Sequence, residues 1–463
     1  MPKKRLARKT KRMRTVRMPA CTLPVAAEAD VVVAGGGTAG LVAAIAAART
    51  GAHTLLIEKQ GYLGGALTGT YCTGPGFFGD SENRQVIKGI GWEVMEHMEK
   101  AGAAIIDREH WRVQSFPESI KTIALDMVQD AGVILFLHSW ASELLIRNSL
   151  IQGVIVESKS GRQFIAGRTF IDATGDADIV FMSGAPTEKL KLDRLWQTSV
   201  DLTVCNVDSS KVAKWVKDNS EKVLLEETPK ATDKSSGPSP MISFIITGNQ
   251  AVQPGAASSR HAGPMPNVKL LIHGTISRVQ GSVAIDGTDV RELTYAEVEG
   301  RRRAMEELEY LKKNVSGYED AFIIGESHLG VRETRRVLGE YVLTVKDLVN
   351  NARFSDVVAL NCRALDRHTK GEVFEITFLQ GNHDIPLRAL TPQKIDNLLV
   401  AGRCISSDHD ANTSLRGAAT CMATGHAAGT AAALAAEEKG LIRSLDIQKL
   451  QGILRKQEAI LST

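Results

Sequence analysis

Residues 31–40 read VVVAGGGTAG, and the next apolar run of the chain, TLLIE, ends at Glu58. Gly35, Gly37 and Gly40 form the pattern G-x-G-x-x-G between an apolar run and an alanine-rich helical pattern. In a strand–turn–helix unit the first glycine permits the tight turn, and the second lets the backbone approach a pyrophosphate. The third lets helix and strand pack closely. The stretch therefore predicts a β-α-β unit that binds a dinucleotide.

Glu58 ends the second strand of this unit, where a carboxylate accepts hydrogen bonds from a ribose diol. A glutamate at this position argues against a 2′-phosphorylated cofactor but leaves both NAD and FAD open. A glycine-rich turn in an unrelated α/β protein is the alternative. The strand, helix, second strand and acid in register favour the dinucleotide site.

Composition sets limits on the function. A chain of 463 residues with 43% hydrophobic and 5% aromatic residues predicts about two domains with a sizeable core. No apolar run reaches the ~18 residues of a membrane span, and we do not expect nucleic acid binding. Six cysteines without a C-x-x-C pair predict neither a disulfide framework nor a metal site, and they favour a cytoplasmic setting.

The first 18 residues are strongly basic. They carry nine Lys or Arg and no acid, so the formal charge of +3 leaves 3 − 9 = −6 for the rest of the chain. We expect residues 1–28 to form a disordered basic arm. A tether to nucleic acid or to an anionic surface is the alternative that remains open.

Apolar periodicity and turn residues predict the organisation of the rest. We expect one dinucleotide-binding domain built from residues 29–190 and 391–463, and a substrate or cap domain with loops over 191–390. A β-rich block with tight connections over 133–175 predicts a meander. Helices are predicted at about 91–102, 118–131, 294–313, 330–338 and 414–438, the third with Thr294 as N-cap and Glu297 in a capping box.

Three later stretches also point to the chemistry of the protein. FIDATGDAD (170–178) is an apolar strand that ends in Ala-Thr-Gly, and NLLVAGR (397–403) is another apolar strand. SLRGAATCMATGHAAGTAAALAA (414–436) is a helix of small residues, which predicts that another element packs very close to it. Its N-terminus directs a partial positive charge at an anion or at an electron-rich ring edge.

With these motifs the chain resembles FAD-dependent oxidoreductases with the glutathione-reductase-type FAD-binding fold. More narrowly, it resembles the large FAD-dependent oxidoreductase family. Besides the glycine pattern, the resemblance rests on LGGALTGT (63–70), GVRETRRVLGEYVLTVKD (330–347), IPLRALTP (385–392), NLLVAGRCIS (397–406) and ATCMATGHAAGTAAALA (419–435). It implies an α/β fold: a Rossmann-like FAD-binding domain, of parallel sheet plus β-meander, with a second mixed α+β substrate domain.

The resemblance also implies which residues bind FAD. The glycine turn and Glu58 would hold the pyrophosphate and the adenosine ribose, and the later motifs would line the flavin and ribityl chain. Arg403 stands where many relatives of this fold carry an aspartate for the ribityl hydroxyls. The implied cofactor-binding residues are Gly35, Gly37, Thr38, Ala39, Gly40, Glu58, Lys59, Gly64, Gly65, Ala141, Thr174, Gly175, Gly402, Arg403, Ser414, Arg416 and Gly417.

Catalytic candidates come from charge and position. His409 lies between the last strand and the small-residue helix, where a histidine can act as the general base. Arg332, Arg335 and Arg336 would share one face of the helix expected at 330–338 and would clamp a carboxylate or phosphate. His383 precedes the IPLRALTP motif. A surface-loop histidine and an exposed, salt-bridged helix face are the alternatives for His409 and the arginines.

Together these features predict an FAD-dependent oxidoreductase that transfers a hydride between a small hydroxylated or carboxylated substrate and flavin N5. A flavin-dependent reductase of an activated C=C bond and a non-redox dinucleotide-binding protein are the alternatives. No second G-x-G-x-x-G is present for a nicotinamide cofactor. The electron acceptor and a homo-oligomeric state stay open.

Overall fold

The computed structural model describes residues 16–17, 19–70, 76–219, 223–225, 242–247, 267–273, 276–367, 375–438 and 440–462. Most of the expected basic arm and much of the irregular stretch around 225–267 lie outside these residues. The arm expected over residues 1–28 extends too far, because the first strand already begins at Val25.

The largest sheet combines parallel strands with a meander. Its order is β6-β2-β1-β9-β8-β7, and β22 pairs with β9. The pairs of β1 with β2 and β9, of β2 with β6, and of β22 with β9 are parallel, whereas β7, β8 and β9 are antiparallel. This arrangement confirms the predicted parallel sheet and meander. The strands are β1 (Val25–Ala34), β2 (Thr54–Ile57), β6 (Ile134–Phe136), β7 (Trp140–Arg147), β8 (Leu150–Ser158), β9 (Gly161–Asp172) and β22 (Leu398–Val400).

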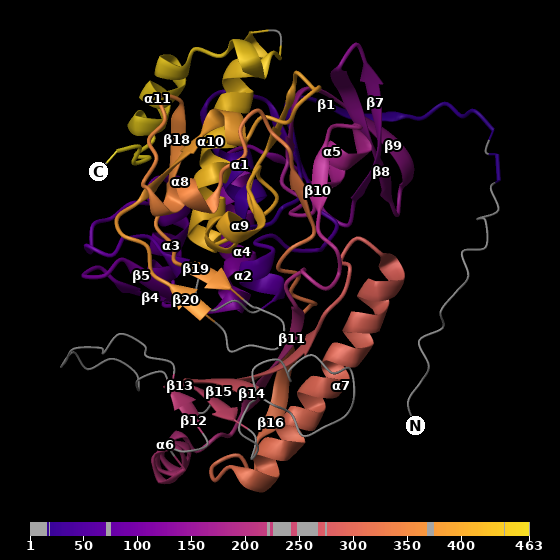
Figure 1. Ribbon diagram of the computed structural model, residues 1–463. Helices are drawn as coiled ribbons and strands as arrows, with labels where there is room; N and C mark the ends of the chain where they lie inside the picture. Colours follow the sequence, from indigo (N-terminus) through magenta and orange to yellow (C-terminus); the bar gives the residue numbers. More distant parts are fainter. Residues whose placement is uncertain are drawn as a thin grey trace.

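Helices α1 (Thr38–Arg49) and α10 (Ala418–Glu437) lie side by side in the core (Figure 1). A Cβ atom on Gly425 would lie 2.2 Å from the Ala39 carbonyl oxygen, and one on Gly429 would lie 2.2 Å from that of Ala43. The small residues of α10 therefore allow backbone-to-backbone packing on α1, as the sequence predicted. The single helix expected over 414–438 is wrong, because α9 (His409–Leu415) ends before Gly417, whose extended ψ of 142° separates it from α10.

Smaller elements surround this core. α3 (Ile90–Lys100) and α4 (Pro117–Asp130) confirm the predicted helices at 91–102 and 118–131. A three-stranded sheet of β3 (Gly76–Phe77), β5 (Arg112–Ser115) and β4 (Ala104–Asp107) lies beside them. The others are α2 (Ala66–Gly69), α5 (Asp178–Met182), α8 (Val345–Val349), α11 (Ile447–Lys456) and the 3₁₀ turns η2 (Leu387–Ala389) and η3 (Ile442–Ser444).

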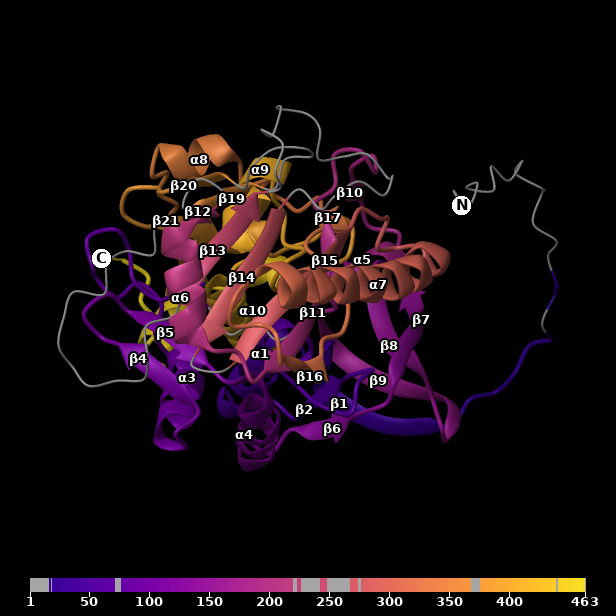
Figure 2. The ribbon, with the colours of Figure 1, turned by 90° about the horizontal axis from the view of Figure 1, so that it is seen from below.

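A second sheet is antiparallel throughout its pairs and has the order β12-β13-β14-β15-β11-β16. The long helix α7 (Val290–Asn314) runs across its strands (Figure 2), and Leu308 and Leu311 pack with Val204 and Val279 in a core of their own. The strands are β11 (Thr198–Cys205), β12 (Val223–Leu225), β13 (Ile242–Thr247), β14 (Asn267–His273), β15 (Ile276–Val283) and β16 (Phe322–Glu326), with helix α6 (Ser209–Asp218).

The predicted start of this helix is wrong. Asp289 is the N-cap of α7 and accepts hydrogen bonds from the backbone of Arg291 and Glu292. Thr294 lies inside the first turns, where its hydroxyl donates to the Val290 carbonyl oxygen at 2.7 Å. Asp289 was available as a cap in the sequence, since aspartate serves as well as threonine there.

The helix expected over 330–338 is also wrong. Residues 335–337 form β17 (Arg335–Val337), which pairs with β10 (Thr187–Lys189). From the end of β17 onward, Val337, Val358 and Leu390 belong to the main core, so the expected domain boundary near 390 does not follow the division between the two cores. The short sheets here are β18 (Val357–Asn361) with β21 (His383–Pro386) and β19 (Leu365–Arg367) with β20 (Glu375–Thr377). Among the described helices, none has the length and apolar character needed to cross a bilayer.

Candidate functional site

The glycine turn after β1 is held by close backbone contacts. Gly35 has φ 101°, and a Cβ atom there would lie 2.5 Å from the Ala173 carbonyl oxygen. A Cβ atom on Gly40 would lie 1.7 Å from the Gly35 carbonyl oxygen. Gly37 instead has an open face and is the N-cap of α1, which has no side-chain cap. The first turn of α1 therefore has backbone N–H groups that no capping side chain satisfies, an arrangement that suits a phosphate.

The Gly64–Gly65 loop lies against this turn. The Gly64 amide donates to the Gly36 carbonyl oxygen at 2.9 Å, and the Thr38 hydroxyl donates to the Gly64 carbonyl oxygen at 3.1 Å. Gly65, at φ 54°, approaches so closely that its Cβ atom would lie 2.7 Å from the Gly37 Cα atom. Residues predicted from two separate motifs thus form one cradle.

The Glu58 side chain contacts the backbone of the same glycine turn. Its buried carboxylate accepts hydrogen bonds from the backbone of Gly36 at 2.6 Å and of Gln60 at 2.7 Å. The ammonium group of Lys59 lies 4.9 Å from the ring centroid of Trp140, the residue before Ala141. The expected adenosine-binding residues therefore lie together, and their contacts with the cofactor remain a prediction.

The carboxyl ends of β9 and β22 meet beside the turn. Asp172 is fully buried at the end of β9, and its carboxylate accepts from the Thr174 hydroxyl at 2.7 Å and the Val180 amide at 3.0 Å. Burial raises the pKa of Asp172. A Cβ atom on Gly402 would lie 2.9 Å from Ala39 Cβ, which places the end of β22 against the start of α1.

Arg403 extends from the end of β22 over Gly175. A Cβ atom on Gly175 would lie 3.0 Å from an Arg403 guanidinium nitrogen. The guanidinium donates to Asp176 at 2.8 Å and to the Val331 carbonyl oxygen at 2.5 Å. Arg403 thus ties the β9 loop to the 330 segment, and its expected contact with the ribityl chain or pyrophosphate stays a prediction.

Polar groups gather where α9 ends and α10 begins. The Ser414 hydroxyl accepts from the Asn361 amide at 2.8 Å and donates to the Arg363 carbonyl oxygen at 2.5 Å. Gly417 is the N-cap of α10 without a side-chain cap, and a Cβ atom there would lie 2.7 Å from Arg363 Cδ. Arg416 lies between the two helices and pairs with Asp366 at 3.0 Å.

His409 begins α9 and lies in a second polar group. Its Nδ1 atom is 2.9 Å from a carboxylate oxygen of Glu333, and its ring stacks on Trp196 with 4.3 Å between centroids and 11° between planes. The Glu333 side chain is 1% exposed and that of His409 is 16% exposed. Because a carboxylate accepts the Nδ1 proton, Nε2 of the neutral ring is left as a proton acceptor.

The three-arginine clamp is wrong. Arg336 is buried and donates to Glu333, to Glu188 at 2.5 Å and to the Ser407 carbonyl oxygen at 3.0 Å. Arg335 pairs with Asp178 at 2.8 Å. Successive side chains of β17 point to opposite faces, so these two guanidinium groups do not converge.

Arg332 lies just before β17 and makes a separate contact. Its guanidinium donates to the Gln197 carbonyl oxygen at 2.6 Å. The structure therefore places Arg336 behind Glu333 and Arg332 beside the Trp196–Gln197 segment.

His383 belongs to another cluster. His383 lies in β21 and is 1% exposed. In the amide orientation that satisfies its hydrogen bonds, the side-chain nitrogen of Asn351 donates to the Nδ1 atom of His383 at 2.9 Å. Burial, aided by the Arg353 charge, lowers the pKa of His383 to about 4. These contacts are separate from those of His409, so the structure does not bring the two candidate histidines together.

Sequence reasoning missed four residues of the polar groups: Trp196, Glu333, Arg363 and Asp366. Trp196 lies far from His409 in the sequence, and no local pattern links them. Glu333 could be read only as one acid in a charged stretch. Within the described part of the chain, no group of three or more His, Cys, Asp or Glu could hold a metal ion.

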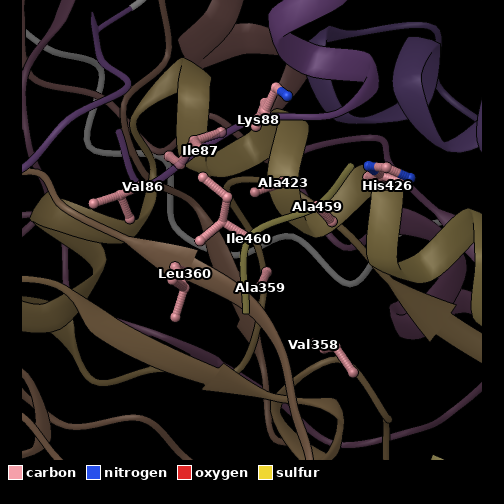
Figure 3. A pocket seen from close by; sticks show the side chains of 10 residues that line it. All are labelled: Val86, Ile87, Lys88, Val358, Ala359, Leu360, Ala423, His426, Ala459 and Ile460. Carbon is pink, nitrogen blue, oxygen red and sulfur yellow. The ribbon is translucent and has the colours of Figure 1, made fainter. Parts of the chain in front are cut away.

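A pocket beside α10 is a weaker candidate for a functional site. It is lined by ten residues, and the side chains drawn in Figure 3 are aliphatic except for Lys88 and His426. His426 is already paired with Gln457 at 2.8 Å. This pocket supplies no group suited to redox or acid–base chemistry.

Comparison with known proteins identifies a family to which the chain belongs. The model of a family described as FAD dependent oxidoreductase matches residues 30–454. None of the curated proteins matches the chain. Among solved structures, a geranylgeranyl bacteriochlorophyll reductase-like protein from Thermoplasma acidophilum is 13% identical, with 93% of this chain and 84% of that chain covered and a TM-score of 0.47. The p-nitrophenol 4-monooxygenase from Pseudomonas putida is 10% identical, with 92% of this chain and 83% of that chain covered and a TM-score of 0.43. At these values the solved structures say nothing of the activity.

Proposed function

We propose that this chain, which belongs to the FAD dependent oxidoreductase family, is an enzyme that transfers a hydride between a small hydroxylated or carboxylated substrate and flavin N5. FAD is its cofactor. The contact of His409 with Glu333 carries the proposal beyond the family, since it supplies a positioned base to accompany hydride transfer.

The described residues fit FAD. The uncapped N-terminus of α1 and the open face of Gly37 suit a pyrophosphate. The uncapped N-terminus of α10 suits the electron-rich edge of a flavin. We infer that the first site is formed by the glycine turn with Gly64 and Gly65, and the second by Ser414 and Gly417.

The bound flavin supplies the hydride acceptor or donor, and the side chains handle the proton. His409 Nε2 would accept a hydroxyl proton from the substrate, since Nδ1 faces Glu333. The Glu333 carboxylate would stabilise the imidazolium that results. Arg336, bonded to the same carboxylate, holds Glu333 in place.

We also propose that the FAD-binding fold is of the glutathione-reductase type. The return of the chain to β22 beside β9, after the parallel strands and the meander, supports this. The second sheet with α7 would act as the substrate or cap domain, since Trp196 and Gln197 lead into β11 and reach His409 and Arg332.

An anaerobic reduction screen tests the proposal. The purified protein with FAD is mixed with panels of hydroxy acids, sugars and amines, and the visible flavin absorbance is followed. A hydroxylated or carboxylated compound should bleach the flavin, and His409→Asn should slow that bleaching by about 100-fold. Bleaching only by amines, or none by any compound, would contradict the proposal.

A further inference from the structure

Two arginines share one carboxylate beside the start of α10. The Asp366 Oδ2 atom accepts from Arg363 at 2.5 Å and from Arg416 at 3.0 Å. The side chains of Arg416 and Asp366 are each only 10% exposed. One buried carboxylate therefore faces two guanidinium groups, on side chains of which that of Arg416 is 10% exposed and that of Arg363 is 24% exposed, so the pair carries one positive charge more than the carboxylate balances.

Further cations increase this excess. Burial lowers the pKa of Arg416 to about 10, and the charges of Arg363, Arg332 and Arg403 add to the effect against the opposing charge of Asp366. Arg403 already has its own partner in Asp176. Burying a positive charge is costly when its carboxylate partner is shared with a second guanidinium group. The site therefore favours an additional anion.

Arg416 also has an unused donor. Its Nε atom is buried and has no hydrogen-bond partner among the described residues. Buried donors are almost always satisfied, and a donor on a guanidinium group suits an anionic acceptor best.

We propose that Arg363 and Arg416 bind the carboxylate of the substrate, so that the enzyme acts on an organic acid. This inference rests on the proposed function and narrows its substrate class. The pair and the base are connected through α9, because His409 is its first residue and Arg416 is its C-cap. The carboxylate and the reacting hydroxyl would then lie toward opposite ends of α9.

Binding to the oxidised holoenzyme tests the proposal without turnover. The protein with FAD is titrated with acetate, malonate and benzoate, which carry no hydroxyl group, and with the three matching amides, and the visible flavin spectrum is recorded. At least one carboxylate should give a saturable spectral change that its neutral amide does not give. If every carboxylate perturbs the spectrum no more than its amide, the proposal is overturned.

Variants separate a substrate site from a cofactor site. Arg363→Gln should weaken carboxylate binding by about 10- to 100-fold while the FAD content stays near that of the parent protein. Arg388→Gln, which breaks the half-exposed pair with Asp356, is the matched control and should bind carboxylates normally. Loss of FAD with unchanged carboxylate affinity in the remaining holoenzyme would show that the pair serves the flavin, and would overturn the proposal.

The two proposals can fail separately. Carboxylate binding that depends on Arg363, with no compound able to reduce the flavin, would remove the hydride-transfer function and leave the anion site. Reduction by neutral alcohols, with no carboxylate binding, would keep the function and remove the anion site.

Discussion

The Nδ1 atom of His409 lies 2.9 Å from a carboxylate oxygen of Glu333, although the two residues are far apart in the sequence. Glu333 is also bonded to Arg336, and the His409 ring is stacked on Trp196. The imidazole is thus held on its Nδ1 side and on one face. Such double restraint is expected where a ring must present Nε2 in a fixed direction.

Glu333→Gln should slow flavin reduction by about 100-fold, because an amide can no longer stabilise the imidazolium or fix the tautomer of His409. The measurement is the rate of anaerobic flavin reduction as a function of pH, with the substrate found in the reduction screen. The dependence of that rate on pH should also differ from that of the parent protein, because the variant lacks the carboxylate that contacts the base.

Glu333→Asp should recover part of the rate, and Glu340→Gln, on the surface beside Arg443, should leave rate and pH profile unchanged. An unfolding midpoint for each variant separates positioning from folding. A Glu333→Gln protein with the parent's pH profile would show that Glu333 has no part in positioning His409.

Gly425→Ala should destabilise the protein by about 3 kcal/mol or prevent folding, since the new Cβ atom would overlap the Ala39 carbonyl oxygen and push α1 from α10. Gly452→Ala in α11 is the matched control. A Cβ atom there meets nothing within 4 Å, so the change should stabilise the protein by about 0.5–1 kcal/mol. Urea unfolding measures both, and equal effects would refute the close helix contact.

The sequence predicted these contacts well where a local pattern dictates the backbone. At Gly35 and Gly40 in the glycine turn, at Gly65 in the next loop and at Gly425 in the small-residue helix only a hydrogen atom fits, and the sequence has glycine at each of these positions. The meander followed from alternating apolar strands and tight turns. The close backbone contacts around the glycine turn could therefore be predicted from the sequence, whereas the contacts of these residues with FAD stay a prediction.

The side-chain chemistry could not be predicted in the same way. Arg332, Arg335 and Arg336 have helical spacing, but pairing with β10 selects a strand for Arg335–Val337, because tertiary hydrogen bonds outweigh local propensity. Partners such as Trp196 for His409 arise from packing between distant segments. Only the fold brings them together, so no spacing rule could have found them.

Glu58→Gln should lower both FAD affinity and the stability of the protein without FAD. Glu58 accepts from two backbone amides, of Gly36 and Gln60, and a glutamine would turn an NH₂ group toward one of them. We expect a loss of about 1–3 kcal/mol in the apoprotein. Thermal unfolding with and without FAD measures it. If only the FAD-bound form changes, Glu58 serves the ribose alone and not the glycine turn.

His426 should make the protein sensitive to mild acid. It is buried, and this burial lowers its pKa from the usual 6.5 to about 4. Between these values the unfolded chain binds a proton that the folded protein excludes, so stability falls as pH drops from 6.5 toward 4. The slope from this one group is at most about 1.4 kcal/mol per pH unit, or about 3 kcal/mol over the window.

His426→Gln should remove that slope. Glutamine does not titrate, so the unfolding free energy of the variant, although lower near pH 7 from lost packing, should change less between pH 6.5 and 4.5 than that of the parent. Urea unfolding across this range gives both curves. His97→Gln, whose side chain is 46% exposed, should keep the parent's slope. Parallel curves for parent and His426→Gln would mean that the buried imidazole is protonated in the folded protein, against the burial seen beside Gln457.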